Sequence, residues 1–325
     1  MMKRTQLYLA GLLVAQIGLI LAFRSPFSSA SAGYESRLLL PALETITPTR
    51  IEVQGSAEEK IEMTRREGGW RIEGLGGFPA DGDKVERLLT DLKGLRVRRP
   101  VVSSGRYHEA FKVADKDHEA RIRLWDASGD PDVDLLVGSS ANFRTSHVRI
   151  AGEAAVYEIR GLSAYDVRPD GGTWIERELV GTDAAGVVGM RLTNAAGSFE
   201  LARRDGAWTV ISPEGAGKRP LDQAKVDELV RTASSIQLSD ASGPVDETAQ
   251  GFGRPAATLV LRWAAAEESD TDAPPRETTV QVGDKVQDNE SQRYVTRQGF
   301  GYAGTVWESS VDRLITGKLD ELYGS

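Results

Sequence analysis

Cysteine is absent from this chain, and histidine occurs three times, as His108, His118 and His147. A chain without cysteine has no disulfide, no thiolate metal ligand, no thiol nucleophile and no cysteine for N-terminal lipid attachment. A histidine-rich metal site would need all three histidines to converge. The sequence therefore favours neither a metal nor a cofactor, and we assign no metal-ligating or cofactor-binding residue.

Long apolar runs are equally scarce. The one long run extends from Leu7 to Phe23 and follows Lys3 and Arg4. A membrane-spanning helix needs about 17–25 residues, whereas the apolar core of a secretory signal has about 7–15. The run therefore indicates an N-terminal membrane anchor within residues 1–33, with residues 7–23 in contact with the lipid bilayer.

The end of this segment leaves cleavage open as an alternative. Ala30-Ser31-Ala32 has the small-x-small form of a signal-peptide cleavage site, so the chain could be cut after Ala32. In both cases the basic flank stays in the cytoplasm, and the residues from Tyr34 onward are exported.

Positive charge does not dominate the composition. Forty Lys and Arg residues stand against 48 Asp and Glu residues, which gives a formal net charge of −8. Nucleic acids and anionic membrane surfaces attract basic proteins, so the sequence predicts no nucleic-acid partner.

Sequence repetition is the strongest positive signal in the exported part. The stretch from Ile61 to Val97 has a degenerate copy from Phe199 to Leu238. In each copy apolar residues alternate on both sides of a glycine-containing turn, which precedes Trp70 and Trp208. This is the period-two pattern of a β-hairpin with one buried face. The pattern predicts two tandem units that share one design.

Each hairpin is followed by a predicted amphipathic helix. Pro79-Ala80-Asp81 and Pro220-Leu221-Asp222 place a carboxylate where it can accept hydrogen bonds from the free N–H groups of a starting helix. The apolar residues that come next have helical spacing and require burial, most simply against the hairpin. They are Val85, Leu88, Leu89, Leu92 and Leu95 in the first unit, and Val226, Leu229, Val230, Ala233 and Ile236 in the second.

The predicted fold class is α+β. It consists of two tandem repeat units, each an antiparallel β-sheet packed against one amphipathic helix, after an N-terminal transmembrane helix. We place a juxtamembrane linker at residues 34–47, the first unit at 48–180 and the second unit at 181–325. The boundary follows Pro169-Asp170-Gly171-Gly172, a turn-rich break, and a short helix is expected within residues 310–323.

Several motif fragments lack a residue that their chemistry needs. Gly299 to Gly304 spells a dinucleotide fingerprint but leads into a predicted strand, which indicates a glycine-rich hairpin connection. Gly215 to Lys218 resembles the end of a phosphate loop, yet Arg219 replaces the hydroxyl residue that would reach the metal. Gly161 to Tyr165 lacks the second glycine of a nucleophile elbow.

Incomplete metal motifs are also present. Asp130, Asp132 and Asp134 have the opening spacing of a calcium loop, but Leu135 stands where that turn requires glycine. This favours a surface turn before a strand. The pairs His108-Glu109 and His118-Glu119 lack the second histidine of a zinc-protease motif. We therefore assign no catalytic residue.

Aromatic residues recur at matching positions of the two units. Large rings on sheet faces bury much apolar area, so we expect these tryptophans in the core and not in a sugar-stacking platform. They are Trp70, Trp125, Trp208, Trp263 and Trp307.

These features together resemble the domain-of-unknown-function 4340 family. The chain has an N-terminal anchor, hairpins with Gly68-Gly69-Trp70 and Gly206-Ala207-Trp208, and the helix starts described above. Val156-Tyr157 and Val306-Trp307 supply the later strands of the pattern. The resemblance departs at Gly215 to Arg219, where the lead into the second helix is lengthened.

The resemblance implies a bacterial protein of the cytoplasmic (inner) membrane with a single span and an extracytoplasmic C-terminal domain. It also implies a membrane-protein partner from a gliding-motility-type ABC transport system, and it supplies no catalytic residue. We therefore expect a non-enzymatic periplasmic accessory or interaction protein. Two alternatives stay open: a protein that binds a ligand or glycan in the cleft between the two units, and an envelope hydrolase that uses a pair of the many carboxylates.

Overall fold

The computed structural model describes residue 16 and residues 35–324, except residues 58, 128, 141–144, 182–183, 215–218 and 265–275. The predicted anchor, residues 7–23, lies outside the described residues apart from Gln16. In the described part of the chain, no helix combines the length and the apolar character that crossing a membrane requires.

The first unit contains a sheet of eight antiparallel strands. Apolar side chains alternate along its central strands, so that Ile51, Val53, Met63 and Ile122 are fully buried on one face. In spatial order the strands are β12 (Tyr157–Arg160), β11 (Thr145–Ile150), β10 (Val133–Val137), β9 (Ala120–Trp125), β2 (Arg50–Gly55), β3 (Lys60–Arg66), β4 (Gly69–Ile72) and β5 (Phe78–Pro79).

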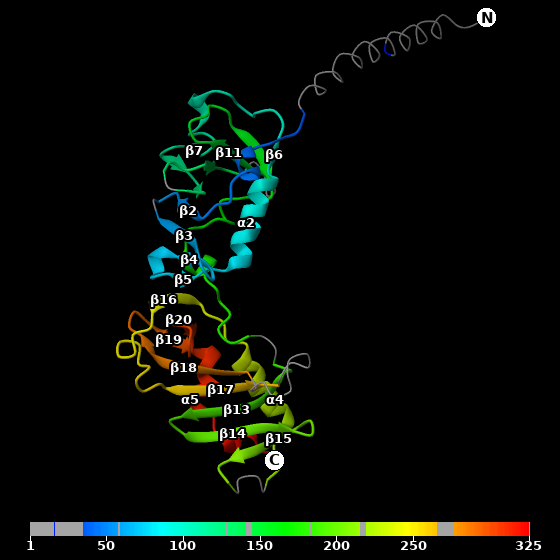
Figure 1. Ribbon diagram of the computed structural model, residues 1–325, viewed down its shortest axis with the longest axis vertical. Helices are drawn as coiled ribbons and strands as arrows, with labels where there is room; N and C mark the ends of the chain where they lie inside the picture. Colours follow the sequence, from blue (N-terminus) through cyan, green and yellow to red (C-terminus); the bar gives the residue numbers. More distant parts are fainter. Residues whose placement is uncertain are drawn as a thin grey trace, which may run out of the picture.

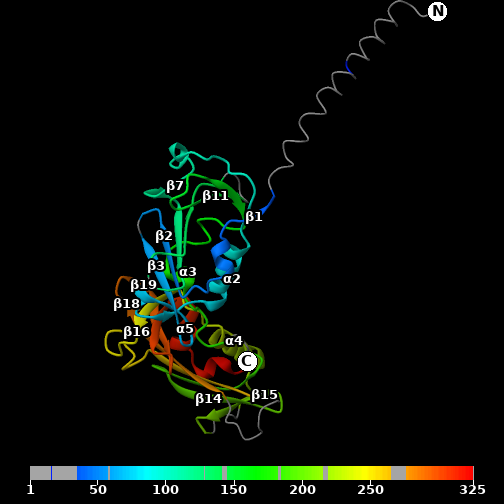
Figure 2. The same ribbon diagram turned by 45° about the horizontal axis from the view of Figure 1, so that its top comes forward.

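Helix α2 (Gly82–Gly94) packs against the buried face of this sheet (Figure 2). It begins after Asp81, whose side chain accepts a hydrogen bond from the Lys84 N–H, as the sequence predicts. Val85, Leu88 and Leu92 face the core. Smaller elements complete the unit: β1 (Arg37–Leu38), η1 (Pro41–Glu44), η2 (Glu73–Leu75), β6 (Arg96–Val97), η3 (Gly105–Tyr107), β7 (Val113–Ala114), β8 (Asp117–His118) and α3 (Gly171–Trp174).

The second unit contains another sheet of eight antiparallel strands. The order of its central strands matches that of the first sheet, since β13 lies between β14 and β17 just as β2 lies between β3 and β9. In spatial order the strands are β15 (Ala207–Ser212), β14 (Gly197–Arg204), β13 (Val187–Asn194), β17 (Ala257–Trp263), β18 (Glu277–Val286), β19 (Asn289–Arg297), β20 (Tyr302–Trp307) and β16 (Asp240–Pro244).

Two helices, and not the single one expected, contact the second sheet. Helix α4 (Gln223–Ser234) begins after Asp222, which accepts hydrogen bonds from the N–H groups of Ala224 and Lys225. Helix α5 (Glu308–Thr316) packs beside it and reaches β13, β17, β19 and β20. The chain then forms the short helix η5 (Leu319–Leu322), so the expected terminal helix is present in two parts.

The two sheets meet edge to edge. Strand β5 of the first unit contacts β16 of the second, and Figure 1 shows the two units one after the other along the longest axis. The C-terminus lies at the end of the second unit that points away from the first (Figure 1). The described residues therefore form an elongated molecule in which the two sheets follow one another along the longest axis.

Residues 175–179, at the end of the first unit, join both units through backbone hydrogen bonds. On one side, Ile175 bridges Ala80, and the Asp81 N–H donates to Trp174 O. On the other side, Glu178 bridges Gln237, and the Leu238 N–H donates to Arg177 O. We call residues 175–179 the joint segment.

Candidate functional site

The phosphate-loop fragment, residues 215–218, lies outside the described residues, and the other motif fragments do not converge in the structure. Gly299 lies in the connection between β19 and β20, so the predicted hairpin is confirmed. Asp132 accepts a hydrogen bond from the Asp126 N–H, and Asp134 forms an ion pair with Arg121, which fits the predicted turn before a strand. Within the described ranges, no three His, Asp or Glu side chains come together as a metal site would require.

The expectation for the tryptophans is correct for part of the set. Trp70, Trp208 and Trp263 belong to the hydrophobic core. Trp125 is buried outside that core, on the opposite face of the first sheet, where the Arg50 guanidinium lies 3.8 Å from its ring centroid. Trp307 is 51% exposed, because it ends β20 at the surface. The prediction of core packing is therefore wrong for Trp307, whereas Trp125 is buried but on the other face of its sheet.

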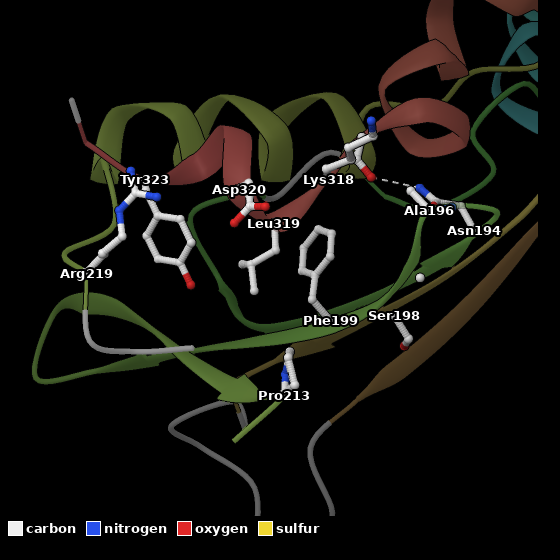
Figure 3. A pocket seen from close by; sticks show the side chains of 12 residues that line it. Asn194, Ala196, Ser198, Phe199, Pro213, Arg219, Lys318, Leu319, Asp320 and Tyr323 are labelled. Carbon is white, nitrogen blue, oxygen red and sulfur yellow. Dashed lines mark hydrogen bonds between the residues drawn. The ribbon is translucent and has the colours of Figure 1, made fainter. Parts of the chain in front are cut away.

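An opening at the C-terminal end of the molecule lies between the β13–β14 hairpin and η5. It is a hollow of about 480 Å³. Figure 3 shows the side chains of Phe199, Leu319 and Tyr323 turned toward one another across it, with Pro213 at its edge. Phe199 is 5% exposed, so its ring forms the floor and is part of the core.

A second hollow of about 350 Å³ lies on the other side of η5. It shares Phe199 and Lys318 with the first and adds Leu229 and Leu322. Together the two hollows run along both sides of η5. We call them the distal groove, lined by Asn194, Phe199, Pro213, Arg219, Leu229, Arg313, Lys318, Leu319, Asp320, Leu322 and Tyr323.

Hydrogen bonds fix the segment that divides the groove. The Lys225 ammonium group in α4 donates to the backbone oxygens of Glu321 and Tyr323, both at 3.1 Å. The Asn194 amide donates to Leu314 O and Gly317 O, both at 2.9 Å. The bonds at both ends of η5 hold its position, so the groove is largely pre-formed.

Charges of both signs border the apolar floor. The Arg219 guanidinium lies 4.8 Å from the centroid of the Tyr323 ring, and Lys318 is exposed at the opposite end. Among the described residues neither cation forms an ion pair, whereas Arg313 pairs with Glu228 at 2.9 Å. Asp320 adds one carboxylate between them. This arrangement suits binding an amphipathic segment, because it offers apolar contact and charges that are free to pair.

Local sequence gave no signal for this groove. The sequence predicts that Phe199 lies in a hairpin and that residues 310–323 contain a short helix, but nothing in either stretch indicates that they meet. The distal groove was therefore missed.

The contact between the units is occupied by aromatic side chains. Phe78 of β5 packs edge-on against Phe300, with ring centroids 5.6 Å apart, and against Tyr302 at 5.3 Å. The side chain of Pro244 fills the space beside Gly76. A ligand at this place would have to displace these rings, so the inter-unit cleft is a poorer candidate than the distal groove.

A family model matches residues 70–248, which is more than half of the chain, and its description is "Domain of unknown function (DUF4340)". The chain belongs to the DUF4340 family. No curated protein and no solved structure matches it. The DUF4340 match begins at Trp70 in β4 and ends at Thr248, just after β16, so it runs from the first sheet across the joint segment into the second.

A charged cluster lies on the exposed face of the second sheet, with Arg191 and Glu200 inside the DUF4340 match and Arg262 and Glu277 beyond it. Glu200 in β14 accepts hydrogen bonds from Arg262 at 2.5 Å and from Arg191 at 2.6 Å. The bond from Arg262 is the main reason that the pKa of the Glu200 carboxyl lies below its ordinary value of 4.5, although burial opposes it. Arg262 also pairs with Glu277. These charges satisfy one another and stabilise the sheet, so they are poor candidates for catalysis.

Proposed function

We propose that this DUF4340 protein is a non-enzymatic, membrane-anchored interaction protein. Residues 7–23 hold it in a bacterial inner membrane, and the described part of the chain lies outside the cytoplasm. Its partner is a membrane subunit of an ABC-type transport system. The apolar run with its basic flank supports the anchor, and the resemblance stated above supports the partner.

We further propose that the two units arose by tandem duplication. Pairs of corresponding contacts support this. The Trp70 indole N–H donates to Glu86 at 3.0 Å, and that of Trp208 donates to Asp227 at 2.8 Å. The bridge between Ala80 and Ile175 has its counterpart between Leu221 and Tyr323.

The lysines near the start of each helix support the same proposal. Lys84 donates to Thr173 O at 2.8 Å, in α3, and Lys225 donates to Glu321 O at 3.1 Å, in η5. In each unit the helix thus anchors the turn that ends the unit. In the first unit the chain continues into the joint segment, and in the second the described chain ends at residue 324.

The observation that carries the proposed function is the distal groove. It is pre-formed and apolar at its floor, and two cations without ion-pair partners among the described residues border it. It lies at the end of an elongated molecule, away from the first unit (Figure 1). Its residues are also far from the proposed anchor in the sequence. We propose that an amphipathic segment of the partner, with an acidic group to meet Arg219 or Lys318, binds there.

A crosslinking pull-down with the full-length protein tests this function. Membranes are crosslinked, solubilised in detergent and purified on the tagged protein, and ABC-transporter membrane subunits are the expected partners. The double variant Arg219→Glu, Lys318→Glu should lose most of them, because it reverses both charges at the groove. Arg254→Glu, which reverses an exposed charge elsewhere in the second unit, is the matched control.

The outcomes separate the parts of the proposal. Recovery of the transporter subunits by wild type and control but not by the groove variant supports both the function and the groove. Equal recovery by all three proteins supports the transporter partner and rules out the distal groove as its binding site. If no transporter subunit is recovered with any of them, the proposed function is wrong.

A further inference from the structure

A wide hollow of about 1260 Å³ lies in the first unit, where β10 ends, β11 begins and β12 ends. It is separate from the distal groove, which belongs to the second unit. Its volume exceeds the several hundred Å³ of a typical small-molecule site, so it could hold several rings of a chain molecule. Its lining combines apolar and polar groups, and the polar side chains open to it include Glu119, Ser139, Ser140, Arg160 and Tyr165.

Hydroxyl groups cluster on one wall. The Ser139 hydroxyl donates to Phe111 O at 3.2 Å, and the Ser140 and Ser146 hydroxyls lie 3.4 Å apart. A serine hydroxyl has one donor and two acceptor positions. Ser146 is buried, so the hydroxyls that keep capacity for a further hydrogen bond to a ligand are those of Ser139, which is half-buried, and Ser140, which is exposed.

Two side chains that can form bidentate hydrogen bonds, those of Arg160 and Glu119, lie at the rim of the hollow. Arg160 and Glu119 are exposed, and neither forms an ion pair with any residue that the structure describes. A guanidinium group offers paired donors and a carboxylate offers paired acceptors. The guanidinium group can donate hydrogen bonds to two neighbouring hydroxyl groups of a sugar ring, and the carboxylate can accept hydrogen bonds from two such hydroxyl groups.

An aromatic ring borders the same hollow. Tyr165 is 71% exposed, the highest value among the exposed large hydrophobic side chains of the described residues. The Arg168 guanidinium lies 4.3 Å from its ring centroid, which restrains the ring. A restrained, exposed ring beside hydrogen-bonding groups offers an apolar face to the C–H side of a sugar, while the polar wall meets its hydroxyls.

We propose that this hollow binds a stretch of a carbohydrate chain, with Tyr165 against the ring face and Arg160, Glu119, Ser139 and Ser140 on its hydroxyls. The charge pattern argues against a free anion, because the carboxylates of Glu119 and Asp166 also line the hollow. Asp166 already accepts hydrogen bonds from the N–H and the hydroxyl of Ser163, at 2.9 and 2.6 Å. A polyol needs both donors and acceptors, and this wall supplies both.

Calorimetric titration of the full-length protein in detergent tests the proposal. The probes are tri- to hexasaccharides of glucose, galactose and N-acetylglucosamine, with inorganic phosphate as the anionic comparison. At least one oligosaccharide should bind, with affinity that rises with chain length. Tyr165→Ala and Glu119→Gln should each weaken binding by about tenfold or more, which corresponds to about 1.4 kcal/mol.

Matched controls come from the same unit. Tyr107→Ala removes another exposed tyrosine that lies under an arginine, and Glu109→Gln removes another exposed carboxylate; neither residue lines the hollow. Both controls should bind like wild type, and circular dichroism should show that all four variants are folded.

Three results would overturn the proposal. The first is that no oligosaccharide of the panel binds. The second is that Tyr165→Ala binds as tightly as wild type. The third is that phosphate binds and competes with the sugar, which would make the hollow an anion site. None of these results bears on the transporter partner, because that test reads out a protein contact at the other unit.

Discussion

Phe78 and Tyr302 place their ring centroids 5.3 Å apart at an interplanar angle of 63°, across the contact between the two units. Phe78 ends the first sheet in β5 and is fully buried, and Tyr302 starts β20 of the second sheet. Phe300 completes a set of three mutually tilted rings. Edge-to-face packing of this kind stabilises beyond the burial of area, so these rings couple the two units energetically.

Replacing Phe78 with alanine should destabilise the protein by about 3–5 kcal/mol, the usual cost of truncating a buried phenylalanine. Urea unfolding, followed by tryptophan fluorescence and by far-ultraviolet circular dichroism, measures the loss. Because the ring couples the units, the two probes should separate in the variant. Tyr165→Ala, at an exposed ring, should be close to neutral, and a loss below about 1 kcal/mol for Phe78→Ala would contradict the role of this contact.

Two glycines allow a loop to lie directly on a strand: Gly138 directly follows β10, and Gly283 lies within β18. A Cβ atom on Gly138 would lie 2.1 Å from Phe111 O, and one on Gly283 would lie 2.1 Å from Gln250 O. Both neighbours are backbone atoms, so Gly138→Ala and Gly283→Ala should each cost at least about 1–3 kcal/mol. Gly74→Ala is the control, since nothing lies within 4 Å of its added Cβ. Thermal unfolding that ranks all three variants alike would refute the close approach.

The two helix caps should contribute similar amounts to stability. Asp81 and Asp222 each accept hydrogen bonds from the first turn of the following helix. Asp81→Ala and Asp222→Ala should each lower the free energy of unfolding by about 0.5–2 kcal/mol. Asp91→Ala, an exposed position inside α2, should change it little, and chemical denaturation compares the three. A cap variant as stable as wild type would show that its bond is replaced by solvent.

The low pKa of Glu200 predicts a pH-dependent contribution to stability. A carboxyl whose folded pKa lies below its unfolded value stabilises the fold above the unfolded value and loses this effect as the pH falls through the folded value. Wild type should therefore melt at a higher temperature than Glu200→Gln at pH 7, and the difference should shrink as the pH falls below 4.5. Glu67→Gln, which removes an exposed carboxylate in the turn between β3 and β4, is the matched control. A constant difference between wild type and Glu200→Gln would contradict the ion-pair assignment.

The hairpins and the helices α2 and α4 could be predicted from the sequence because their signals are local. Alternation before Trp70 and Trp208, the aspartate caps and the apolar stripes each depend on residues a few positions apart. Val85, Leu88 and Leu92 are buried as expected, whereas Leu89, at the edge of the stripe, is half-buried.

Trp125 shows where local pattern fails. Leu124 and Trp125 are adjacent in β9 and both buried, so they lie on opposite faces of the sheet. The recurrence of tryptophan in the two units predicts core packing for Trp125 as it does for Trp263, but it does not specify the face of the sheet. In the structure Trp125 pairs across the strands with Arg50, and the arginine covers it on the charged face.

The distal groove and the hollow of the first unit could not be predicted for a related reason. Phe199 meets Leu319 only because α4 holds η5 through Lys225, a contact that joins residues far apart in sequence. Ser140 and Arg160 are likewise brought together by strand pairing from β10 to β12. No spacing along the chain encodes these distances.

The joint segment has a practical consequence for anyone who wishes to study the units one at a time. Its residues bond to Ala80 and Pro79 on one side and to Ile236 and Leu238 on the other. A cut after Trp174 removes from the first unit the bridge between Ala80 and Ile175. A cut after Val180 removes from the second unit the bridge between Glu178 and Gln237. Ile175 and Glu176 bond to the first unit, whereas Arg177, Glu178 and Leu179 bond to the second. The peptide bond between Glu176 and Arg177 is therefore the place to divide the protein, because a cut there leaves each half with its native backbone pairing.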